Sequence, residues 1–460
     1  MVYEDFELLA TDVQNGEKDG RKRVTFQVRV VRSPSGEKID GVPTEYDIDQ
    51  MYDHLKRFEL FEIDWKAAIQ WGTWLSTVLF PGAVHHLLLR SIEQMKAQKK
   101  GLRIRLLMED PLFNIPWEYL LLNRGGGEAV ESDFLALMPG VSITRHQAAT
   151  LPPWEVKTRH TAQLLVALAN PKGSKPLDLD KERQVIRQAI EGNERIKAIF
   201  VADATPETLL KDVEKVHLFH FAGHGDFQVK TAVESGAVEG KAYIILGDGS
   251  NGAALLSAGQ LALRLRQAGV RAAVLGACLS GRRDHIYVWS SLAAALLKAE
   301  LGAVVGMQYF IKDESAIAFT GAFYRALVSG LPIDEAVTYG RIAVAQKDTC
   351  DWGVPVLYLR APDGVIFPEY AADSALEKAR KQIRVKIKQQ AQVIKGKMTG
   401  VEVTRMTRGK VNVKQTMGTV TESGEVTGFK AEQMEGGSVE SDQTVDKVEG
   451  NVTGVRLDTL

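Results

Sequence analysis

Two residues of this 460-residue chain have the types and surroundings needed for nucleophilic chemistry. His224 follows an apolar run in Val216–Asp226, VHLFHFAGHGD, and Cys278 follows a similar run in Arg271–Gly281, RAAVLGACLSG. A nearby imidazole favours the thiolate, which is the nucleophilic form of cysteine, and it can then protonate a leaving amine. If the two runs form neighbouring strands, His224 and Cys278 lie side by side at their ends, and the pair is suited to acyl transfer.

Small residues flank both candidates. Gly223 and Gly225 allow the backbone to turn sharply and to approach a ligand closely. The backbone N–H groups of Gly225 and Cys278 are therefore our candidates for an oxyanion hole, which would stabilise the negative charge of a tetrahedral intermediate.

The same motifs carry a family resemblance. HFAGHG and GACLSG lie about fifty residues apart, and the sequence resembles the CHAT family of caspase-like and separase-like cysteine peptidases. The resemblance continues through LLVALANP at Leu164–Pro171, LGAVVGMQYFIKDESAIAFTGAFYRAL at Leu301–Leu327 and DWGVPVLYLRAPDG at Asp351–Gly364. It implies a caspase-like fold and a cysteine endopeptidase that works as a His224 and Cys278 dyad. It also implies activation by a partner or ligand, in bacterial defence or regulated cell death.

The resemblance further suggests where substrate specificity arises. In separase-like members an acidic residue comes shortly after the strand that follows the cysteine, and here that residue is Asp313, within FIKDESA. A carboxylate in a partly desolvated pocket selects Lys or Arg before the scissile bond. Asp313 equally fits the N-cap of a helix over Glu314–Ser329. The other candidates are Asp226 and Asp284 for the same pocket, and Arg282 and Arg283 for an acidic substrate.

Other interpretations of these residues are structural. His217, His220, His224 and Cys278 together suggest zinc, but strand alternation puts His217 and His220 on opposite faces, so we expect no metal and no cofactor. Cys350 is expected to be a small core residue or a surface thiol.

Composition limits the class of protein. The formal net charge is −1 and 45% of the residues are hydrophobic, so a large core is expected and no global field attracts nucleic acid or membranes. Two cysteines cannot build a disulfide framework, and no signal peptide is evident. The longest apolar stretch, Leu292–Met307, contains Lys298 and Glu300, so we expect no membrane span and a cytoplasmic location.

The chain divides into four predicted regions. Residues 1–155 form a mixed α/β region, expected from the resemblance to be a regulatory or pseudo-peptidase half, and Gln147–Thr158 is the predicted boundary. Residues 156–370 alternate apolar strands with helices, including helices at Leu179–Ile190 and Thr205–Glu214, and predict a mostly parallel sheet flanked by helices. A basic helical linker over 371–396 and a repetitive tail over 397–460 follow.

The tail changes composition. Residues 371–410 have eleven Lys and Arg against three Asp and Glu, whereas 411–460 have four against nine. We favour solvation of these charges, or pairing of the basic part with the acidic part, over nucleic-acid binding. Gly-x-Val recurs at Gly409, Gly418, Gly424, Gly437 and Gly450, which predicts either short β repeats stacked as a solenoid or a flexible segment. We favour β repeats that serve assembly or sensing.

The alternative function is a catalytically silent CHAT scaffold whose tail mediates oligomerisation or ligand sensing.

Overall fold

The structure is a computed structural model, and it divides the chain into two compact units, Met1–Pro368 and Glu369–Leu460. Each unit is described by itself. The described residues are 2–59, 63–109, 111–122, 129–146, 161–209, 211, 216–232, 238–250, 252–277, 286–309, 311–361, 364–366, 386–394, 397–406, 410–420, 425–434, 438–448 and 451–457.

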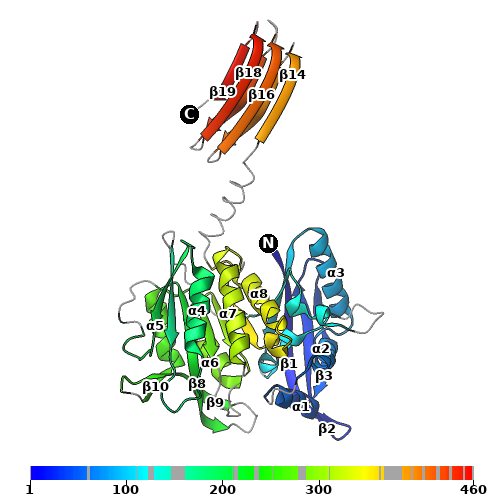
Figure 1. The fold of residues 1–460 in the computed structure, drawn as a ribbon. Helices are drawn as coiled ribbons and strands as arrows, with labels where there is room; N and C mark the ends of the chain where they lie inside the picture. The colour runs from blue at the N-terminus through cyan, green and yellow to red at the C-terminus, as the bar shows by residue number, and fades with distance from the viewer. Residues whose placement is uncertain are drawn as a thin grey trace. The chain divides into compact units, whose positions relative to one another are not determined.

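The first unit is built on one sheet of thirteen strands (Figure 1). Apolar residues with strong strand preference fill its centre, and β12 and β13 are buried at every position, as expected for strands covered on both faces. The strands are β1 Tyr3–Lys18, β2 Arg21–Arg32, β3 Lys38–Asp47, β4 Gly101–Met108, β5 Val141–Arg145, β6 Ala162–Leu168, β7 Ile196–Val201, β8 Leu218–Ala232, β9 Val238–Gly247, β10 Ala253–Ser257, β11 Ala272–Ala277, β12 Ala303–Met307 and β13 Pro355–Leu359.

The predicted mostly parallel sheet is confirmed. Strands β7, β6, β8, β11 and β12 are parallel in that spatial order, and β13 adds antiparallel to β12. The sheet then continues through β5, β4 and β1, which are parallel to one another, to the antiparallel β2 and β3. The strands of the predicted regions 1–155 and 156–370 therefore belong to one sheet.

A buried ion pair and a buried hydrogen bond also connect the two halves of this unit. Arg103 on β4 donates to Asp334 at 2.8 Å, and both side chains are almost completely buried. Arg145 on β5 donates to Glu118 at 2.6 Å and to the side-chain oxygen of Gln308 at 2.9 Å. The contacts of Arg103 with Asp334 and of Arg145 with Gln308 therefore join β4 and β5 to the second half of the unit, and removing one partner of the Arg103 pair would leave a buried charge uncompensated.

Helices cover both faces of the sheet (Figure 1). Residues on alternate positions of β8 separate the two layers, because His220 contacts α4 and α7 whereas Phe219 and Phe221 belong to a core cluster with residues of α5 and α6. The helices are α1 Ile48–Glu59, α2 Trp65–Leu79, α3 Ala83–Ala97, α4 Leu179–Ile190, α5 Ala258–Ala268, α6 Ile286–Lys298, α7 Asp313–Val328 and α8 Ile333–Ala345, with short 3₁₀ turns at Leu112–Asn114, Trp117–Tyr119, Glu131–Asp133, Leu135–Leu137 and Cys350–Gly353. Among the described residues, no helix is both long enough and apolar enough to cross a membrane.

The strand that carries His224 changes its neighbour at that residue. Along Leu218–Ala222, one edge of β8 pairs in parallel with β6, which ends at Leu168. From His224 onward β8 pairs antiparallel with β9 instead. The departure of β6 opens the sheet beside His224, at the kind of position where α/β proteins bind ligands.

Several local predictions differ from the structure. The strand containing His224 does not end at the glycines, because the pairing with β9 extends it to Ala232. The described part of the predicted helix Thr205–Glu214 is a turn, in which Thr205 Oγ1 accepts from the Thr208 N–H at 3.1 Å. The predicted boundary Gln147–Thr158 lies outside the described residues.

The second unit contains two three-stranded parallel sheets. β14 Lys386–Ile394, β16 Lys410–Val420 and β18 Ser438–Val448 form one, and β15 Lys397–Met406, β17 Glu425–Met434 and β19 Asn451–Leu457 form the other. Successive strands alternate between the sheets, which is the arrangement of a two-sided β-solenoid. Residues 386–394 are therefore a strand and not part of the predicted helical linker, because they pair in parallel with β16.

Candidate active site

The register between β8 and β11 brings the two predicted catalytic segments together. Ala277, the residue before Cys278, pairs with Gly223, the residue before His224. The two strands are parallel, so both chains leave the pairing in the same direction. Cys278 itself lies outside the described residues.

His224 is held by a backbone carbonyl. Its side chain is almost completely buried, and Nε2 lies 3.0 Å from the carbonyl oxygen of Lys175. A carbonyl oxygen can only accept a hydrogen bond, so Nε2 carries the hydrogen and donates it. In this tautomer of the neutral imidazole, Nδ1 carries no hydrogen and is the basic nitrogen. A general base requires such a nitrogen.

Asn170 fixes the segment that supplies this carbonyl. Its side-chain amide is satisfied when Nδ2 donates to the Lys175 carbonyl at 3.2 Å and Oδ1 accepts from the Leu177 N–H at 3.1 Å. The Lys175 carbonyl thus accepts from both Asn170 and His224. Asn170 lies within LLVALANP, but its type and position in the sequence did not indicate this role, because its partners are backbone groups of the following loop.

A buried hydrogen-bond network lies on the same face of β8. His220 Nε2 donates to Glu182 Oε1 at 3.1 Å, and Nδ1 lies 3.1 Å from the Tyr324 hydroxyl. Thr320 also donates to Glu182 Oε1, at 3.2 Å. Burial, reinforced by Glu182, raises the pKa of Tyr324 well above its usual range, so the phenol stays protonated and donates to His220. The network links α4 and α7 to β8 at His220, four residues before His224.

A depression lies between α4, α7 and the ends of β8 and β11. Its outer part has a volume of about 480 Å³ and is lined by Lys175, Lys181, Lys312 and Asp313 among others. Leu177, Asp178, Asp313 and Ile317 also line its narrow inner part, together with Glu182, Gly223 and Gly276. Three carboxylates, those of Asp178, Glu182 and Asp313, therefore line the part closest to the catalytic strands.

Asp313 is the first residue of α7, and Lys312 occupies the N-cap position. The predicted helix is confirmed, but Asp313 is not its N-cap. The carboxylate of Asp351 satisfies the helix start instead, accepting from the Lys312 N–H at 3.3 Å and from the Ser315 hydroxyl at 2.7 Å.

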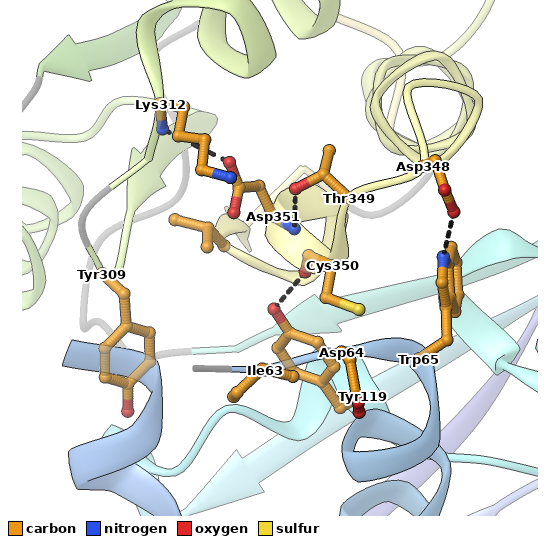
Figure 2. Close-up of a pocket in the computed structure, with 11 residues that line it drawn as sticks. Ile63, Asp64, Trp65, Tyr119, Tyr309, Lys312, Asp348, Thr349, Cys350 and Asp351 are labelled. Carbon is orange, nitrogen blue, oxygen red and sulfur yellow. Dashed lines mark hydrogen bonds between the residues drawn. The ribbon is translucent and has the colours of Figure 1, made fainter. Parts of the chain in front are cut away.

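A separate cavity of about 290 Å³ also has Lys312 in its lining (Figure 2). Its carboxylates have structural hydrogen bonds, because Asp351 contacts the start of α7 and Asp348 accepts from Trp65 Nε1 at 2.9 Å. Cys350 also lines it, and burial, with Asp351 nearby, raises the pKa of this thiol to about 12. The cavity therefore contains an inert thiol and supports the helix that bears Asp313.

The remaining predicted residues have the following positions. Gly225 and Asp226 lie on β8, opposite Ile244 and Tyr243 of β9. His217 accepts a hydrogen bond from the Gln163 N–H at 2.9 Å, which is a structural role. Asp284, Arg282 and Arg283 lie outside the described residues, like Cys278.

The fold and the site define an α/β protein in which a histidine lies where β8 changes its neighbour from β6 to β9. This histidine is one residue beyond the paired ends of two parallel strands. The model of the CHAT domain family matches residues 70–394, which is more than half of the chain. The chain belongs to the CHAT domain family, and the predicted resemblance is confirmed.

Solved structures also align with parts of the chain. The Saccharomyces cerevisiae separase–securin complex aligns at 16% identity with a TM-score of 0.32, covering 60% of this chain and 17% of that chain. The Arg-specific cysteine proteinase gingipain R aligns at 12% identity with a TM-score of 0.33, covering 60% and 68%. The complex of Porphyromonas gingivalis RgpB pro- and mature domains aligns at 10% identity with a TM-score of 0.36, covering 63% and 70%. A comparison with curated proteins found no match.

Proposed function

We propose that the chain is a cysteine endopeptidase in which Cys278 is the nucleophile and His224 is the general base and acid. The observation that carries the proposal is the pairing of Ala277 with Gly223, each one residue before a proposed catalytic residue. The bond from His224 Nε2 to the Lys175 carbonyl supports it, because this bond fixes the tautomer in which Nδ1 is the basic nitrogen.

The proposed reaction has two stages. The sulfur of Cys278 attacks the peptide carbonyl carbon, its proton passes to His224, and the N–H groups of Gly225 and Cys278 stabilise the oxyanion. Collapse of this intermediate breaks the C–N bond, the amine leaves with the proton from His224, and a thioester remains. Water, deprotonated by His224, then attacks the thioester, and the carboxylic acid product leaves as the thiol is restored.

We further propose that the residue before the scissile bond is Arg or Lys. The carboxylates of Asp178, Glu182 and Asp313 support this, since they line the inner depression together with Gly223 and Gly276. A basic side chain there would lie beside negative charges, which favours Arg or Lys over a neutral or acidic side chain.

The test measures cleavage of fluorogenic peptides with Arg, Lys, Leu or Asp before the scissile bond, with and without cell lysate as a source of an activating partner or ligand. We expect cleavage after Arg or Lys, and its loss in Cys278→Ala and in His224→Ala. Asp313→Asn should lower the preference for Arg over Leu by about ten- to a hundredfold. Asp226→Asn is the matched control, because Asp226 lies on β8 opposite Tyr243 and does not line the depression.

Two results would contradict the proposal. If Asp313→Asn and Asp226→Asn changed the preference for Arg over Leu equally, the depression would not be the specificity pocket. No cleavage under any condition, with no labelling of Cys278 by an electrophilic probe, would favour the catalytically silent scaffold.

A further inference from the structure

The repeat of the second unit is a pair of strands. Residues at equivalent positions of neighbouring strands are 26 or 28 residues apart, as in Lys386 opposite Asn412 and Asn412 opposite Glu440. Similar residues recur at equivalent positions. Gln389, Gln415 and Gln443 share one position, and Val401, Phe429 and Val455 share another. At these two positions the outer strands of each sheet repeat the residue type of the inner strand.

Both ends of this unit present edge strands. Among the described strands, β14 and β15 are the edge strands at one end, and β18 and β19 are those at the other; Figure 1 shows β14 and β18 on opposite sides of β16. The outer edge of a parallel strand carries backbone N–H and C=O groups that can pair with a further strand. In repeat proteins, stacking of equivalent units satisfies such edges, and terminal repeats normally differ from the inner ones.

The two ends carry opposite charges. β14 contains Lys386 and Lys388 and no acidic residue, whereas β18 contains Glu440, Asp442 and Asp446 against a single lysine. Pairing β14 with β14, or β18 with β18, would bring like charges together, which is unfavourable between neighbouring strands. Only pairing of β18 with β14 brings opposite charges together.

The register predicts which charges would meet. Lys386, Asn412 and Glu440 share one position, so the Lys386 of a following copy would be placed opposite Glu440. In the other sheet Glu402, Lys430 and Arg456 share a position, so a following Glu402 would be placed opposite Arg456. Both junction pairs have opposite signs. The glutamine position would also continue, from Gln443 to the next Gln389, as in stacked in-register sheets.

We propose that the second unit is a head-to-tail stacking module for a second copy of this chain. β18 and β19 of one copy pair in parallel and in register with β14 and β15 of the next. Because each copy presents one end of each kind, the interface is heterologous and more than two copies can join. Because separate chains associate, assembly depends on protein concentration. Because the junction pairs are charged, it also depends on salt.

The test measures the molecular mass of the full chain by sedimentation velocity over a range of protein concentrations. A Cys278→Ala background keeps proteolysis from removing the tail. We expect the wild-type tail to give a mass above that of one chain that rises with concentration. Lys386→Glu and Glu440→Lys should each weaken association about tenfold, since each turns an attractive junction pair into a repulsive one. Both residues have the neutral Asn412 as their neighbour within the chain, so neither change adds a like-charged pair there.

Two further variants separate stacking from folding. An equimolar mixture of Lys386→Glu and Glu440→Lys should associate again, because alternating copies then have opposite charges at every junction. Arg456→Glu should also weaken association, although inside the chain it replaces a residue whose register partner, Lys430, has the same sign of charge. A chain that stays monomeric at all concentrations, variants that associate like the wild type, or a mixture that fails to recover would each overturn the proposal.

Discussion

Gly223 and Gly276 provide a matched test of how closely the catalytic strands are packed. A Cβ atom added at Gly223 would lie 2.6 Å from Phe221 Cζ and 2.8 Å from the backbone oxygen of Ala169. A Cβ added at Gly276 would have Glu182 Oε1 as its nearest neighbour, at 3.5 Å, which is ordinary van der Waals distance. Neither glycine has a positive φ, so the two substitutions differ in the available space.

The expected magnitude follows from these distances. The Phe221 ring can rotate, but the Ala169 oxygen belongs to the chain leaving β6, so Gly223→Ala must move β8 or that chain by several tenths of an ångström. Overpacking of this kind costs about 1–3 kcal/mol, which corresponds to a fall in melting temperature of roughly 1–4 °C for a unit of this size. Since His224 is the next residue, a shift of β8 should also reduce kcat/KM by at least about tenfold.

The assay is thermal unfolding of the wild type, Gly223→Ala and Gly276→Ala, followed by peptidase measurements well below the lowest melting temperature. Gly276→Ala serves as the stability control and should keep a melting temperature close to that of the wild type and above that of Gly223→Ala, because such a contact requires no overpacking. If Gly223→Ala were as stable as the wild type, or if Gly276→Ala were the more destabilised, the argument from packing at the strand ends would be wrong.

Three other predictions concern single groups. At pH 8 a thiol reagent should label one cysteine per native chain, Cys278, and two after unfolding, because the buried Cys350 thiol with its pKa raised to about 12 stays protonated; labelling of Cys350 in the native chain would contradict this. Asn170→Ala should lower kcat about ten- to a hundredfold with little change in melting temperature, since it frees the loop that holds the proposed base; an unchanged kcat would refute the positioning role. Tyr324→Phe should destabilise the chain by about 1–3 kcal/mol in denaturant unfolding, because it leaves buried His220 without its hydroxyl partner; unchanged stability would show that the network contributes nothing.

Local patterns in the sequence predicted the strands and helices well. The alternation of apolar strands and helices predicted for residues 156–370 is present in the structure, where β12 is buried at every position because helices cover both faces of the sheet. The predicted helix Leu179–Ile190 is α4, capped by Asp178, whose side chain accepts from the Lys181 N–H. These features depend on residues that are neighbours in the chain.

In the tail, too, local sequence predicts the strands, whereas long-range pairing decides how they are arranged. Gly-x-Val marks the start of four strands, since Gly409, Gly424, Gly437 and Gly450 each immediately precede the first residue of a described strand. A glycine suits the turn before a strand, so this pattern predicts the strands. Which strands pair, and in which register, is set by residues 26 or 28 positions apart and was not evident from the spacing of the glycines.

The sequence by itself determined the family, the candidate dyad of His224 and Cys278, and the alternation of strands and helices, because residue type and short-range periodicity carry that information. Only the tertiary structure decided that β8 exchanges β6 for β9 at His224, and that the Lys175 carbonyl orients the imidazole. It also decided that Glu182 on α4 reaches the buried His220. These contacts join backbone groups and side chains far apart in sequence, so residue type does not indicate them and only long-range packing brings them together.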